Sequence, residues 1–212
     1  MHRAANVAIA VVLVAIAGVV GGGVWLLRER RADSAAASLP VADTVRTVEV
    51  DPADVAGLPV AVEVPAGEGE CPPHAFRAPG EPLAAVDGGR TFLLGDDGSA
   101  ILTVCLGSVA ELGTPEELVA DIWAGTFPVE DAVAAEMMAE LESATERLYV
   151  ERVASPYGEA IALTTRIGPS LVTDHYVARD GWVHAVGYLR RDGSGDPDRA
   201  LVDAVLASWQ WR

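Results

Sequence analysis

The order of apolar and polar residues separates one long apolar run from a patterned region that follows it. In the patterned region, several segments alternate apolar and polar side chains, which is the period of a half-buried strand. The first strands of this kind are predicted at residues 44–50, 58–64, 90–94 and 99–106. The last two flank Gly95–Asp96–Asp97–Gly98, a typical hairpin turn. Residues 68–82 are rich in Gly, Pro and Glu and are predicted to form a loop.

Helical signals follow in the middle of the chain and at its end. Thr114–Pro115–Glu116–Glu117 is a capping box with proline at the first helical position, so we expect a helix from there to about Ala124. A second, longer helix is predicted at 130–146, with a buried stripe of Val133, Met137, Leu141 and Ala144. A closing helix is predicted from Asp196–Pro197 to Trp209.

Between the second and the closing helix, the pattern predicts a meander of four strands. Their ranges are 147–154, 159–167, 171–179 and 182–190, with turns at Gly168–Pro169 and Asp180–Gly181. Strands and helices are therefore segregated along the chain. This order predicts an α+β fold with a mostly antiparallel sheet, two central helices and a C-terminal helix.

The apolar run, Val7–Leu27, has no charged residue. As a helix it would be about 31 Å long, roughly the thickness of the hydrocarbon core of a bilayer. It is longer than the apolar part of a cleaved signal peptide, and Arg28–Arg31 stands before the next small residues. We therefore expect a short tail at 1–6, a retained transmembrane anchor at 7–27, a juxtamembrane linker at 28–43 and one domain at 44–212.

The sequence signals disagree on which side of the membrane this domain lies. Arginines at 28, 30 and 31 favour the inside, by the positive-inside rule. A short N-terminal tail before a first apolar helix usually stays in the cytoplasm, which favours export. The two cysteines, Cys71 and Cys105, also favour export, because an exported domain would join them in a disulfide. Two buried free thiols are the alternative. The interpretation we carry forward is a single-pass cell-membrane protein with an extracytoplasmic domain.

Two further features bear on partners. Gly18 and Gly22 lie one helical turn apart in the anchor, a spacing that would let two membrane helices approach and form a homodimer, although composition alone also explains a glycine-rich helix end. Residues 32–212 carry 11 arginines against 30 acidic residues. Such a charge repels nucleic acid and anionic lipid headgroups, so a nucleic-acid partner is not expected.

A family resemblance rests on three parts of the chain. A strand ends in the sequence VEVPAG with Pro65, a four-strand meander follows the central helices, and the closing segment ends in Ser208–Trp209–Gln210–Trp211. Over residues 44–212 this resembles the PsbP-like fold, which the LpqN-like group of actinobacterial envelope proteins shares. The resemblance implies a binding or accessory module without catalytic residues. The chain departs from that group in having an apolar anchor in place of a lipidated cysteine.

The candidate ligand-binding face lies on the last hairpin. A two-residue turn at Asp180–Gly181 would pair His184 with Val177 and His175 with Val186, which makes the two histidines diagonal neighbours on one face. Trp182, Tyr188, Thr173 and Arg179 share that face. Two histidines among aromatic residues could form a ligand groove or part of a metal site, although a third ligand is not visible and partly exposed sheet histidines are the commoner case.

The sequence gives only weak signals of other functional sites. Asp192–Asp198, with Asp203 beyond it, resembles a calcium loop, but Pro197 stands where such a loop needs glycine, and a turn with a helix cap explains the same residues. No nucleophile motif, zinc-protease motif or phosphate loop occurs. We therefore expect no enzyme, no cofactor and no bound metal, and a non-catalytic binding or scaffolding role with a protein or small-molecule partner. A metal- or ligand-dependent enzyme using the His175/His184 face, and a cytoplasm-facing accessory domain, are the alternatives.

Overall fold

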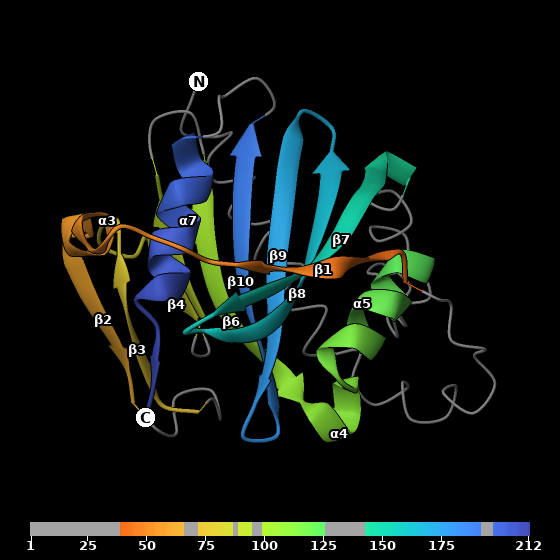
Figure 1. The fold of residues 1–212 in the computed structure, drawn as a ribbon, viewed down its shortest axis with the longest axis horizontal. Coiled ribbons are helices and arrows are strands. Elements are labelled where there is room, and N and C mark those ends of the chain that lie inside the picture. The colour runs from red at the N-terminus through yellow and green to blue at the C-terminus, as the bar shows by residue number, and fades with distance from the viewer. Residues whose placement is uncertain (1–38, 66–71, 87–88, 95–98, 126–142, 192–196) are drawn as a thin grey trace.

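In the computed structural model, the residues described are 39–65, 72–86, 89–94, 99–125, 143–191 and 197–212. They form an α+β fold built on a large, mostly antiparallel sheet (Figure 1). The sheet has eight strands in the order β1-β7-β8-β9-β10-β6-β5-β4, and only β1 and β7 pair in parallel. The strands are β1 (Val41–Thr47), β4 (Ala84–Val86), β5 (Gly89–Leu93), β6 (Ala100–Ser108), β7 (Thr145–Ser155), β8 (Gly158–Ile167), β9 (Ser170–Arg179) and β10 (Trp182–Arg191).

The four-strand meander, β7 to β10, confirms the prediction from alternation and turn chemistry. Its last turn is Asp180–Gly181, with positive φ angles of 50° and 83°. Positive φ at both central residues is what a two-residue hairpin turn of this hand requires. As predicted, His184 pairs with Val177 and His175 pairs with Val186. The turn therefore sets the register of the hairpin on which the candidate residues lie.

A second, three-stranded sheet was missed by the sequence analysis. It has the order β11-β3-β2, formed by β2 (Val60–Val64), β3 (His74–Ala78) and β11 (Gln210–Trp211). The prediction of a loop over 68–82 is wrong for its second half, because β3 lies there. The closing helix is also shorter than predicted: α7 spans Pro197–Ala207, and the residues after it turn into β11.

Three more helices are described. α5 (Pro115–Ala124) confirms the predicted capping box, since Thr114 caps the backbone of Glu117 and the Glu117 side chain returns to Thr114. α3 (Pro52–Gly57) and α4 (Val109–Leu112) were not predicted. The predicted helix at 130–146 lies mostly outside the described residues. Its end is wrong, because Thr145 already belongs to β7 and Ala144 is exposed.

Both faces of the large sheet are covered, so the domain has two apolar cores. On one face, α7 and the small sheet pack against inward side chains such as Val177 and Val186. On the other face, α4 and α5 pack against Val183 and Ala185. Figure 1 shows α7 crossing one end of the large sheet and α5 lying beyond its other end. The histidine-bearing face is therefore the one under α7.

Of the predicted N-terminal elements, only the end of the linker and the first strand fall within the described residues. β1 begins at Val41, three residues inside the predicted linker. The predicted anchor at 7–27 lies outside the described residues, and so do Gly18 and Gly22. None of the helices in the described ranges is long and apolar enough to cross a membrane.

Candidate functional site

The structure corrects the expectation that His175 and His184 sit on an open face of the sheet. His175 is 3 % exposed and His184 is fully buried. The period-2 pattern placed both side chains on one face, but α7 and the small sheet cover that face. The two histidines also have different surroundings.

His184 belongs to an aromatic cluster between the two sheets. Its Nδ1 shares a 2.9 Å hydrogen bond with the Tyr157 hydroxyl. Its ring centroid lies 5.0 Å from that of His74 and 5.1 Å from that of Trp209, and Trp211 closes the cluster by donating from Nε1 to the Tyr157 carbonyl at 2.8 Å. Burial first, and the neighbouring His74 second, hold the pKa of His184 well below its usual range. The ring is therefore neutral and acts as part of the core.

His175 instead forms part of the floor of a cavity, which we call the α7 pocket. The cavity has a volume of about 120 Å³ and lies between α7, β1 and the strands β7 to β10. Its floor carries a row of four hydroxyl side chains, one from each of four neighbouring strands. The register places Tyr149 opposite Thr164, Thr164 opposite Thr173, and Thr173 opposite Tyr188.

The wall of the α7 pocket is an ionic network that joins distant parts of the chain. Nη1 of Arg46, on β1, donates to both carboxylate oxygens of Asp203, on α7, at 3.0 and 2.8 Å. Nε of Arg46 lies 3.6 Å from Oε1 of Glu151, on β7. The same oxygen lies 3.3 Å from Nη2 of Arg199, on α7. Each carboxylate is therefore held by at least one guanidinium before any ligand arrives.

Burial and the arginines of the pocket act together on His175 at the floor. Burial first, and the charge of Arg46 next, lower the pKa of His175 from 6.5 to about 4, and Arg199 adds to this effect. Only the hydrogen bond between Nδ1 and the Val186 carbonyl, at 3.3 Å, opposes it. Because a carbonyl oxygen only accepts, Nδ1 carries the proton of the neutral ring. Both arginines therefore disfavour the charged form of the ring at this position.

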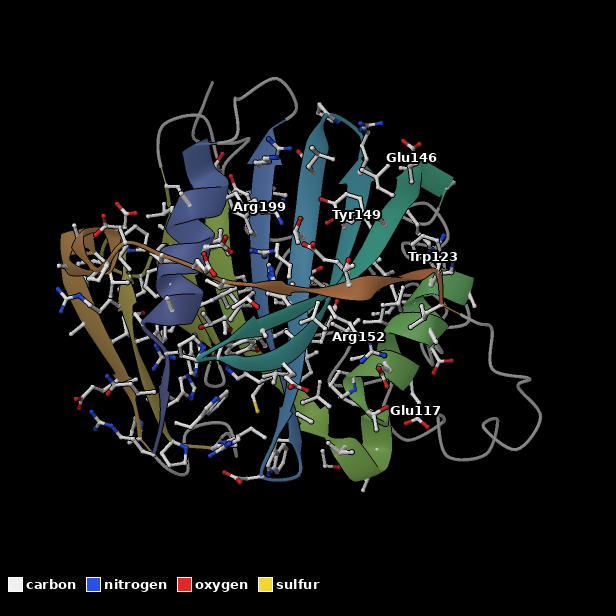
Figure 2. All side chains as sticks on the ribbon, in the orientation of Figure 1. Glu117, Trp123, Glu146, Tyr149, Arg152 and Arg199 are labelled. Carbon is white, nitrogen blue, oxygen red and sulfur yellow. The ribbon has the colours of Figure 1, made fainter. Side chains whose placement is uncertain are left out.

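Tyr149 and Arg199 mark the mouth of the pocket. The Tyr149 side chain is 46 % exposed, and the Arg199 side chain is 43 % exposed. Figure 2 shows Tyr149, from β7, and Arg199, from α7, on the same side of the large sheet with β9 between them. A ligand entering from solvent would meet these two side chains first.

The remaining predicted site residues lie in different parts of the fold. Tyr188 lines the α7 pocket, whereas Trp182 lies half-buried at the other end of β10, where it pairs with Arg179 and Ser108. Cys105 lies in β6, and no described cysteine is a free thiol. Cys71 lies outside the described residues, so the Cys71–Cys105 disulfide stays a prediction.

The calcium alternative falls partly outside the described residues, because 192–196 are not among them. Its last member, Asp203, is bound to Arg46 instead. Within the described ranges, no three His, Cys, Asp or Glu side chains come together in a way that could hold a metal ion.

An acid on the opposite face, Asp174, is partly buried, which the sequence analysis did not predict. Asp174 points away from His175, as neighbours on a strand must, and burial raises its pKa to about 7, while a hydrogen bond with Tyr176 partly offsets the rise. The residues of the pocket wall were missed as well. Arg46, Glu151 and Arg199 are far apart in sequence and belong to no motif, so nothing in the chain marked them as neighbours.

Comparison with known proteins does not assign the chain to a family. No protein-family model matches the chain, and no curated protein matches it.

Proposed function

We propose that the chain is a single-pass cell-envelope protein whose C-terminal domain binds a ligand or partner without catalysing a reaction. The apolar run at 7–27 supports the anchor, and the two cysteines support an extracytoplasmic domain. The soft resemblance to PsbP-like envelope proteins favours a binding module over an enzyme. In this proposal the α7 pocket is the binding site.

One observation supports the choice of site: the α7 pocket is lined by charged and hydroxyl side chains, reaches solvent at Tyr149 and Arg199, and is already ordered by its own contacts. Arg46 is held by Asp203 and Glu151, and these contacts join β1, β7 and α7. Binding groups that are held in place lose little conformational entropy when a ligand arrives, and this lowers the cost of binding. The core cluster around His184 offers no comparable access, because its rings are packed against one another.

Photocrosslinking in intact cells tests the proposal. A benzophenone amino acid is placed at Tyr149, at the mouth of the pocket, or at Leu83 as a matched control. Leu83 is 54 % exposed and stands just before β4, at the opposite edge of the large sheet. We expect crosslinked adducts from position 149 and none, or far fewer, from position 83. Equal labelling at the two positions, or none at either, would show that the pocket mouth is not a binding site.

The anchor and the orientation need their own measurement. A membrane-impermeant thiol reagent is applied to intact cells and, separately, to denatured protein with and without prior reduction. An extracytoplasmic, disulfide-bonded domain reacts only after denaturation and reduction, and the protein stays in the membrane fraction after an alkaline wash. Two thiols that are free after denaturation and protected in cells would instead place the domain in the cytoplasm.

A further inference from the structure

The chemistry of the α7 pocket also indicates what class of ligand it takes, and this step rests on the proposed function of the pocket. Arg199 supplies hydrogen-bond donors at the mouth of the pocket. A guanidinium has five N–H donors in one plane. The described contact of Arg199 is a single one, from Nη2 to Glu151 at 3.3 Å, and the side chain is 43 % exposed at the mouth. Its other N–H groups make no described hydrogen bond, and the exposed side chain leaves donors available to a ligand that arrives from solvent.

The charged side chains around the cavity also favour a ligand that accepts hydrogen bonds and carries negative charge. Three arginines, Arg46, Arg190 and Arg199, and two carboxylates, Glu151 and Asp203, line it. The lining therefore holds one more positive than negative group, in a chain whose formal net charge is −16. After burial, the charges of Arg46 and Arg199 also contribute to the lowered pKa of His175 at the floor. The arginines of the lining therefore favour an anionic ligand, although the chain as a whole is acidic.

The hydroxyl row extends the donor set across the floor. Thr164 and Thr173 share a 2.9 Å hydrogen bond, which orients this pair, and Tyr149 stands at the rim with an exposed aromatic face. The cavity of about 120 Å³ is several times larger than the roughly 10–15 Å³ that a cavity needs to hold one water molecule. It therefore accommodates a small anionic group, with any apolar remainder of the ligand beside the Tyr149 ring.

We propose that the α7 pocket binds a small-molecule carboxylate, with Arg199 donating to its two oxygens and Tyr149 packing against the part of the ligand nearest the mouth. A planar guanidinium matches a carboxylate in a two-point contact. A phosphate dianion fits less well, because its second charge would lie beside Glu151 and Asp203, which already neutralise much of the charge of Arg46 and Arg199. An acidic protein partner would meet the repulsion of the whole acidic domain, which a small molecule with one charge largely escapes.

The test compares benzoate with benzamide, its neutral counterpart of the same shape. Both are titrated into the full-length protein in detergent, with histidine labelled so that the His175 ring is observed by NMR. Benzoate should shift the His175 signals and raise the pKa of His175, because its charge offsets those of Arg46 and Arg199. Benzamide should do neither. Inorganic phosphate and an acidic peptide, tested in parallel, should bind more weakly than benzoate.

Variants locate the contact. Arg199→Gln should weaken benzoate binding at least tenfold, since a hydrogen bond to a charged group contributes about 1.5–3 kcal/mol and 1.4 kcal/mol is a factor of ten. Arg152→Gln is the matched control: Arg152 is a similarly exposed arginine that pairs with Glu116, outside the pocket lining. It should bind benzoate as the wild type does. Both substitutions are at exposed side chains, so the histidine spectra of the free variants should retain the native dispersion.

The outcomes separate the two proposals. If benzamide binds as well as benzoate, if phosphate or the peptide binds better, or if the two arginine variants behave alike, the carboxylate proposal is overturned. If benzoate does not bind at all while position 149 still crosslinks in cells, the pocket is a binding site for another class of ligand. If benzoate fails and position 149 gives no adduct, the proposed function of the pocket fails as well.

Discussion

Replacing His175 with glutamine should remove a large part of the protein's sensitivity to mild acid. His175 is 3 % exposed, and its Nδ1–H donates to the Val186 carbonyl at 3.3 Å. A glutamine amide can donate to the same carbonyl but does not titrate. The variant therefore separates the protonation of the ring from the packing of the side chain.

The sign follows from where the proton binds. The pKa of His175 is lowered from 6.5 to about 4 in the folded protein, because burial and the charges of Arg46 and Arg199 disfavour the imidazolium. Between these two values the unfolded chain binds a proton that the folded protein does not, so acid favours unfolding. The stability from the neutral ring is fully present above about pH 6.5 and is lost as the pH falls toward 4. A difference of 2.5 pH units corresponds to about 3 kcal/mol.

Urea unfolding of the full-length protein in detergent, followed by tryptophan fluorescence at pH 7 and pH 4, measures this difference. The free energy of unfolding of the wild type should fall by about 3 kcal/mol more than that of His175→Gln over this range. The remaining titrating groups are common to both proteins and cancel in the comparison. Parallel pH profiles for the two proteins would refute the reasoning, because His175 would then titrate alike in the folded and unfolded states.

Four other predictions use the same unfolding measurement. Asp174→Asn should remove a pH dependence of the opposite sign. Because burial raises the pKa of Asp174 to about 7, the free energy of unfolding of the wild type should fall by about 2–4 kcal/mol relative to the variant as the pH rises from 4 to 8. Equal pH profiles for the two proteins would contradict this. Gly158→Ala should cost about 1–3 kcal/mol, because φ is 141° and the new Cβ would lie 2.5 Å from Cγ2 of Val177; an unchanged midpoint would count against the strain. Trp209→Ala should cost about 3–5 kcal/mol, because the ring is 3 % exposed and stacks on its neighbours at the junction of the two sheets, whereas a loss below 1 kcal/mol would mean that the cluster repacks. Reducing the predicted disulfide should cost up to about 4 kcal/mol for a loop of about 35 residues, and no effect of reductant would argue for free thiols.

Several elements followed from the sequence alone because short-range chemistry determines them. Asp180–Gly181 predicted the tight turn and hence the register that places His175 and His184 on one face. The capping residues Thr114 and Glu117 predicted the start of α5. In both cases the groups that decide the conformation lie within a few residues of one another, so no knowledge of the rest of the fold is needed. The α+β class followed as well, since segregated strands and helices leave few other arrangements.

The candidate site depended instead on contacts that no local pattern contains. Alternation shows which side chains share a face of a strand, but not whether another layer covers that face; α7 and the small sheet decided that for the histidines. β3 was hidden in a Pro- and Gly-rich stretch, and its pairing with β2 and β11 comes from opposite ends of the domain. Arg46 and Asp203 are 157 residues apart and meet because α7 packs beside β1. The sequence by itself thus determined most strands of the large sheet, the turns of the meander and the pairing of its last hairpin. Only the tertiary structure decided which polar groups would be buried together and form the α7 pocket.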